Sequence, residues 1–109
     1  MTYTPEQLDK MRDWVALNVM GYRPNLKSYF GSLGFIVTQE DFKPDEDANQ
    51  MLMALDTFDW WAVGRNKEPD CNAFGDYCCA VTYSSKVVVN KSLGLAALVA
   101  MCRASGMPE

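Results

Sequence analysis

The chain has no histidine among its 109 residues. Histidine is the side chain that most often acts as a general acid or base near neutral pH, and without it a zinc site is limited to thiolate and carboxylate ligands. The glycine-containing segment 31–34 (Gly-Ser-Leu-Gly) has neither the spacing nor the lysine of a phosphate-binding loop. No catalytic signature is present, and we expect neither enzyme activity nor a cofactor.

The chain also lacks a membrane-spanning segment, since no apolar run approaches the ~20 residues that a spanning helix requires. Its N-terminus has no basic region followed by an apolar stretch, as a secretory leader would. An apolar fraction of 49% with 22% charged residues is typical of folded soluble domains. We therefore expect a soluble, cytoplasmic protein with no membrane partner.

Positive charge is sparse, because 10 basic residues stand against 14 acidic ones, for a net charge of -4. The basic residues are scattered along the chain rather than clustered, and direct nucleic-acid binding needs a concentrated basic surface. The acidic run 45–47 is too short to imitate nucleic acid. The mild acidity favours solubility and would steer the protein toward a basic partner surface.

The four cysteines do not form a metal-binding pattern. Cys71, Cys78, Cys79 and Cys102 lack the two-residue spacing of paired thiolate ligands. In a strand, Cys78 and Cys79 would point to opposite faces and would not share one ion. Nothing near them is expected to lower a thiol pKa, so we interpret them as small buried apolar residues rather than as a metal site or a nucleophile.

The clearest structural signal is an apolar helix near the C-terminus. It begins near Ser92 and is apolar on most of its circumference up to Cys102, so other elements must cover it on more than one side. Ser92 or Asn90 can cap its first turn, and Gly106 can end it. Because 109 residues suffice for a single core, we predict one domain, residues 1–109, built around this helix.

Two further helices are indicated. Thr4 and Gln7 can form a capping box with Pro5 at the first helical position, and Gly21 is suited to end this helix. Pro44 and the carboxylates of residues 45–47 predict the start of a second helix, where negative charge meets the positive end of the helix dipole.

Between these helices and the last one, the pattern predicts three strands. Residues 60–64, 77–83 and 86–90 are rich in aromatic and β-branched residues, and the polar segment 65–75 is expected to be a long hairpin loop. Both faces of the 77–83 segment are apolar, which predicts helices on both faces of the sheet. We predict an α+β fold in the order α-α-β-β-β-α, a small antiparallel sheet of about three strands with three helices in a layered α-β-α sandwich.

Residues 22–42 fit this scheme least well. Aromatic residues alternate there with Pro24, Gly31 and Gly34, and only residues 35–38 resemble a strand. A segment of about twenty residues without regular structure is uncommon in a compact domain unless it is functional. We predict an irregular aromatic loop that forms an interaction surface; the alternative is a loop whose aromatic rings pack on the core.

Several short segments resemble a family of small phage proteins, the phage ABA sandwich domain. These are residues 19–22 (V-M-G-Y), 42–49 (F-K-P-D-E-D-A-N), 91–92 (K-S), 96–98 (A-A-L) and 102–104 (C-R-A). The resemblance covers most of the chain apart from residues 23–41. It implies an α-β-α layered domain from a phage or prophage, without established activity and without catalytic residues to carry over.

Together these observations favour a phage-encoded, non-enzymatic protein that binds a host or viral protein in the cytoplasm of the infected bacterium, for instance an inhibitor of a defence system such as CRISPR interference. Aromatic residues and arginine contribute most to interfaces. The predicted partner-binding residues are Tyr22, Tyr29, Phe30, Phe35 and Arg65. The alternatives are a self-assembling accessory domain that forms a homodimer, and a small-ligand carrier or enzyme with a pocket beside Trp60 and Cys79.

Overall fold

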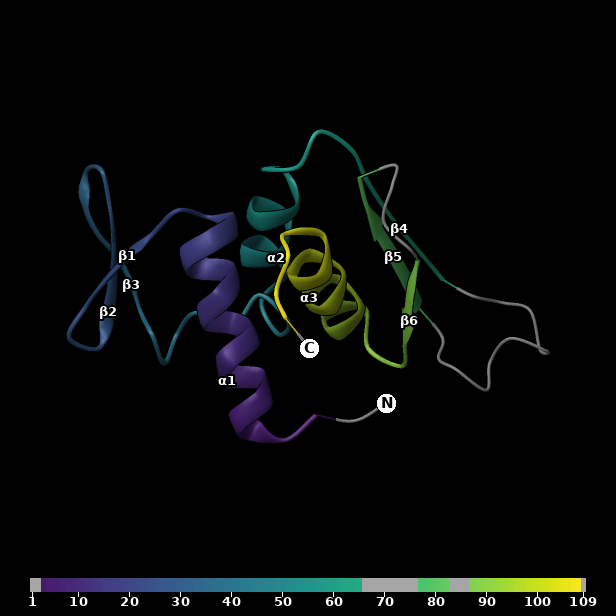
Figure 1. The fold of residues 1–109 in the computed structure, drawn as a ribbon, viewed down its shortest axis with the longest axis horizontal. Helices are drawn as coiled ribbons and strands as arrows, with labels where there is room; N and C mark the ends of the chain where they lie inside the picture. Colours follow the sequence, from purple (N-terminus) through teal and green to yellow (C-terminus); the bar gives the residue numbers. More distant parts are fainter. Residues whose placement is uncertain (1–2, 66–76, 83–86, 109) are drawn as a thin grey trace.

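The computed structural model describes residues 3–65, 77–82 and 87–108, and these form three helices and two antiparallel sheets of three strands (Figure 1). The expected α+β class, with three helices and a three-stranded antiparallel sheet before the last helix, is confirmed. In chain order the elements are α1 (Pro5–Trp14), a π-helical turn (Val15–Val19), β1 (Arg23–Asn25), β2 (Ser28–Gly31), β3 (Gly34–Thr38), α2 (Ala48–Leu55), β4 (Trp61–Arg65), β5 (Tyr77–Val81), β6 (Val88–Asn90) and α3 (Leu93–Ala104).

Helix α3 is the centre of the molecule, as the sequence predicts. Every residue from Ala96 to Cys102 is buried. Helices α1 and α2 contact α3 on one side, and β5 and β6 contact it on the other (Figure 1). The hydroxyl of Ser92 accepts a hydrogen bond from the backbone N–H of Leu95 at 3.3 Å, and Gly106, with φ +90°, follows the helix in the left-handed region.

The first turn of α3 packs directly against the chain that leads into α2. A Cβ atom on Gly94 would overlap the backbone carbonyl of Asp45, so only glycine fits there. While the backbone of Asp45 contacts α3, its carboxylate accepts two hydrogen bonds from Arg12 on α1, each at 2.7 Å. The hydrogen bond to Asp45 raises the pKa of the Arg12 guanidinium, while partial burial opposes this. Asp45 therefore joins α1 to the start of α3.

The acidic run 45–47 only partly serves as expected. Helix α2 begins at Ala48, and Asp47 caps it by accepting hydrogen bonds from the backbone N–H groups of Asn49 and Gln50 at 2.9 and 3.2 Å. Asp45 lies outside the helix and pairs with Arg12 instead. The expectation that all three carboxylates stabilise the helix N-terminus is wrong in this respect.

Helix α1 starts as expected, with the capping box of Thr4 and Gln7 and with Pro5 as its first residue. Its final part is a π-helical turn in which Val15 and Ala16 are fully buried. Gly21, with φ +71°, follows in the left-handed region. The turn leads the chain out of the core toward the first sheet.

The sheet β4–β6 covers one face of α3. Strand β5 lies in the middle, with Val63 opposite Cys79 and with Cys79 opposite Val88. Cys79 and Val81 are buried, whereas Cys78 and Ala80, which point to the other face, are partly exposed. Figure 1 shows the helices on one side of this sheet. Among the described residues, the helices expected on the second face of the sheet are not found.

Residues 22–42 differ most from expectation, because they contain the strands β1, β2 and β3 in one antiparallel sheet rather than an irregular loop. Two-residue turns connect the strands, at Leu26–Lys27 and at Ser32–Leu33. Pro24 sits in the edge strand β1, where its missing N–H is tolerated, and Gly34 supplies a φ of +114° next to the second turn. The residues that we interpreted as interruptions are turn and edge positions. The predicted hairpin loop after Arg65 lies outside the described residues, as do Cys71 and Tyr83.

Candidate protein-binding surface

The sheet β1–β3 is attached to the helices mainly through one tyrosine. Tyr29 is 3% exposed, and its hydroxyl donates a hydrogen bond to Asp13 Oδ1 on α1 at 2.6 Å. Its ring packs against Phe42 and Tyr22, with centroid distances of 5.7 and 6.3 Å. Burial, together with the hydrogen bond to Asp13, raises the pKa of the Tyr29 hydroxyl, and burial also raises that of Tyr22. Both hydroxyls therefore stay neutral, and that of Tyr29 joins the sheet to α1.

The opposite face of this sheet carries a row of three residues in register. Since neighbouring residues of a strand point to opposite faces, Phe30 points away from the helices where Tyr29 points toward them. Phe30 lies opposite Arg23 on β1 and Phe35 on β3. The two phenyl rings meet edge to face, with centroids 5.9 Å apart at 79°. Phe35 is 59% exposed. An arginine and two aromatic rings thus form an outward-facing row.

The two turns extend this apolar surface. Leu26 is 92% exposed and Leu33 is fully exposed. Ile36 is exposed as well, but its side chain lies beside Gly31, the strand neighbour of Phe30, and so belongs to the other face. Leu26 also has a φ of +57°, a conformation in which leucine is less favourable than asparagine or glycine. Local backbone strain at an exposed position is a pointer to function rather than to folding. Four of the eight large apolar side chains that lie exposed in the described residues belong to this one sheet.

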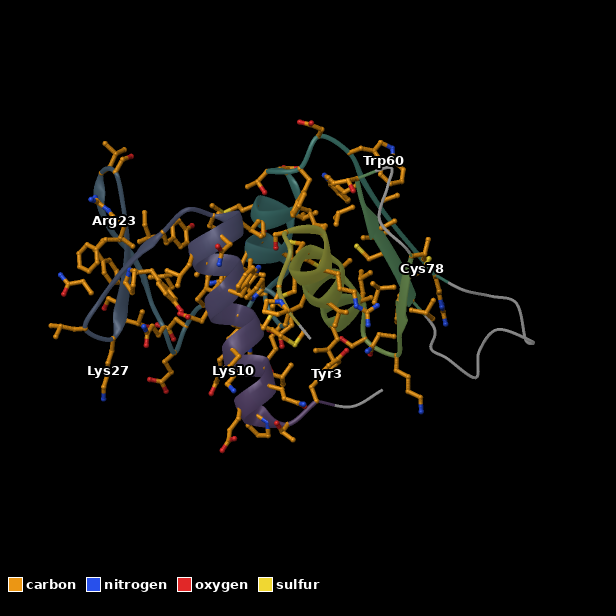
Figure 2. All side chains as sticks on the ribbon, in the orientation of Figure 1. Tyr3, Lys10, Arg23, Lys27, Trp60 and Cys78 are labelled. Atoms are coloured by element: carbon orange, nitrogen blue, oxygen red, sulfur yellow. The ribbon has the colours of Figure 1, made fainter. Side chains whose placement is uncertain are left out.

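Charge distinguishes the sheet from the rest of the protein. Residues 22–38 contain Arg23 and Lys27 but no acidic residue, for a local charge of +2. The remainder of the chain has 8 basic and 14 acidic residues, a net charge of -6. Figure 2 shows Arg23 and Lys27 on this sheet at one end of the molecule. We use the name "outer sheet surface" for the outward-facing residues of this sheet and its two turns. It consists of Arg23, Leu26, Lys27, Phe30, Leu33 and Phe35.

The structure brings together only part of the predicted partner-binding set. Phe30 and Phe35 are paired on the outer sheet surface. Tyr22 and Tyr29 lie on the opposite, core-facing side, so Tyr29 is not accessible to a partner. Arg65 ends β4 in the other sheet, which lies across the helices from β1–β3 in Figure 1. The members that sequence reasoning missed are mainly turn residues, which the alternation of two short strands around residues 26–27 and 32–33 could have revealed.

The cysteines do not gather into a reactive or metal-binding site among the residues that the structure describes. Cys79 and Cys102 are buried, and burial raises the pKa of Cys79 to about 11 and that of Cys102 to about 12. Both are neutral thiols near pH 7 and are therefore poor nucleophiles. Within the described ranges, no helix has the length and apolar character needed to cross a membrane.

Solved structures with this fold exist, and one of them matches nearly the whole chain. No protein-family model matches the chain, and neither does any curated protein. The solved structure is described as a phage protein from Bacillus cereus ATCC 14579, and it superposes with a TM-score of 0.62 at 8% sequence identity. The match covers 93% of this chain and 94% of the other. The chain is therefore similar in fold, over nearly its whole length, to this phage protein.

Proposed function

We propose that the protein is encoded by a phage and acts, without catalysis, by binding another protein through the outer sheet surface. The phage origin rests on the fold that it shares with the Bacillus cereus phage protein and on the resemblance to the phage ABA sandwich domain. Its place of action is then the cytoplasm of the infected bacterium. The observation that carries the binding role is the row of Arg23, Phe30 and Phe35 between two exposed leucine turns.

The chemistry of this surface supports one kind of partner. Exposed aromatic rings and arginine are the side chains that contribute most to protein interfaces, and apolar patches of this kind are rare on monomers without a binding role. Because the sheet is positive on a negative protein, the partner surface is an acidic rim around an apolar depression. The attraction to a basic partner that we expect from the net charge of the chain applies to the residues outside 22–38, which carry the negative charge. We propose a component of a bacterial defence system, of the CRISPR interference type, as the target.

Affinity capture from infected host cells tests this role when it is done with matched variants. The wild-type chain should retain one stoichiometric partner, which Arg23→Glu and Phe35→Ser lose. Met53→Ser is the control, because Met53 is 56% exposed but lies on α2, outside the outer sheet surface. A partner that survives both sheet substitutions, or that Met53→Ser also loses, contradicts the assignment of the surface.

The defence role has its own readout. Expression of the protein in a host that carries a matching CRISPR spacer should restore plaque formation by the targeted phage, and Arg23→Glu with Phe35→Ser should abolish this effect. Unchanged immunity in the presence of well-expressed protein would exclude inhibition of that system while leaving the binding surface to the capture experiment.

Self-association is the second candidate, because the positive sheet and the negative remainder of the same chain are complementary. Sedimentation at several protein concentrations separates the two. A stable oligomer that Phe35→Ser dissociates favours self-assembly, whereas a monomer at every concentration favours a different partner.

A further inference from the structure

A groove lies between α1 with the residues just before it, the last turns of α3 and the segment that follows α3. Its volume is about 530 Å³, within the range of small-molecule sites. Figure 2 labels two of the lining residues, Tyr3 just before α1 and Lys10 in the middle of that helix. None of the residues that line the groove belongs to the outer sheet surface.

The floor of the groove is apolar and deformable. Met11, Val99 and Cys102 form it, and they are 8%, 4% and 4% exposed. The Cys102 thiol points to the backbone carbonyl of Met11, with Sγ 3.6 Å from the oxygen, so its polar atom is satisfied. Met107 forms part of the wall and is half-buried. Flexible thioether side chains adapt to apolar ligands of varied shape.

The rim of the groove is positively charged. Lys10 on α1 and Arg103 in the last turn of α3 both line it and are exposed. Among the described residues neither of the two forms an ion pair, and no acidic side chain lines the groove. This is notable in a protein with a net charge of -4. Two cations that pair with no acidic residue of the described ranges, beside an apolar floor, complement a ligand that has an anionic head and an alkyl tail.

We propose that this groove binds an amphipathic carboxylate such as a medium-chain fatty acid. The carboxylate lies between Lys10 and Arg103, and the alkyl chain lies on Met11, Val99 and Met107. Burial of the alkyl chain supplies most of the affinity, and the two cations select the sign of the head group.

Decanoate, used below the concentration at which it aggregates, is the probe. Calorimetric titration of the whole chain should show binding that weakens as salt is added, and decyltrimethylammonium, with the same alkyl chain and the opposite charge, should bind at least about tenfold more weakly. Equal binding of the two probes, or no binding of decanoate, overturns the proposal.

Variants place the site. Lys10→Gln and Arg103→Gln should each weaken decanoate binding about three- to tenfold, and the double variant should weaken it further. Lys27→Gln is the matched control, since Lys27 is an exposed lysine on the outer sheet surface. In spectra of methyl-labelled methionine, Met11 and Met107 should shift with decanoate and Met53 should not. Binding that the double variant retains in full, or shifts confined to other methionines, contradicts the site. Capture of a protein partner is expected to be unaffected by these substitutions, so the two proposals fail independently.

Discussion

The two sheets have the same construction and opposite relations to the core. Each has three antiparallel strands with the second strand in the middle. The sheet β4–β6 buries Cys79, Val81 and Val88 against α3, whereas the sheet β1–β3 buries only Tyr29 among its strand residues. The difference shows that one topology can serve two ends: packed along a helix it completes the core, and attached mainly through Tyr29 it leaves its other side chains exposed or only partly buried.

The largest expected effect concerns the helix that the sheet β4–β6 covers. Gly94→Ala should lower the free energy of unfolding by about 3 kcal/mol, because the added methyl group overlaps the Asp45 carbonyl and forces the chain before α2 to move. In an ordinary helix the same change would be stabilising by up to about 1 kcal/mol, so the sign is diagnostic. Urea denaturation measures it.

Gly64→Ala is the control, because a Cβ there would lie 3.4 Å from Cys78 Sγ, an ordinary contact. It should leave the free energy of unfolding within about 0.5 kcal/mol of the wild type. If Gly94→Ala were neutral as well, α3 and the chain before α2 would not meet as closely as the structure has them.

The same substitution in each sheet tests the comparison directly. Val81→Ala should cost about 2 kcal/mol, because Val81 is fully buried and the change leaves a cavity beside α3. Val37→Ala on β3 should cost less than about 1 kcal/mol, because Val37 is only partly buried. Thermal unfolding of both variants checks this, and equal losses would mean that both sheets belong equally to the core.

The attachment of the sheet β1–β3 can be loosened at one atom. Tyr29→Phe removes the hydrogen bond to Asp13 and should cost about 1.5 kcal/mol, the value for a bond to a charged acceptor. Hydrogen exchange should quicken in residues 23–38 and stay unchanged in β4–β6. Tyr22→Phe is the matched control, since no hydrogen bond joins its hydroxyl to another described residue. Loss of protection throughout the molecule would show that the sheet is not a separate unit.

The smallest expected effect is a gain. Leu26→Asn should raise the free energy of unfolding by about 0.5 kcal/mol, because asparagine tolerates the left-handed φ at this turn better than leucine. Leu33→Ser, at the fully exposed position of the other turn, should change it by less than about 0.5 kcal/mol. Both should weaken partner capture. A variant that stabilises the fold while it weakens binding would show that Leu26 is kept for the interface.

The sequence predicts the core better than the surface. The uninterrupted apolar run of α3 and the capping residues of α1 are local signals, and they place both helices correctly. The outer sheet surface was missed because Pro24, Gly31 and Gly34 resemble interruptions until the pairing of their strands is known. The hydrogen bond of Tyr29 joins it to Asp13, 16 residues away, and that of Asp45 joins it to Arg12, 33 residues away. No local pattern encodes such pairs.

The central place of α3 has a consequence for biosynthesis. The helix occupies residues 93–104, yet Met11, Leu55 and Val81, from elements made earlier, are buried in the same core as its side chains. Until that helix has left the ribosome, these residues have no helix surface to pack against. The close contact between Gly94 and the backbone of Asp45 cannot form either. We therefore expect the nascent chain to depend on chaperones until α3 has emerged, and to become protease-resistant in a single step thereafter.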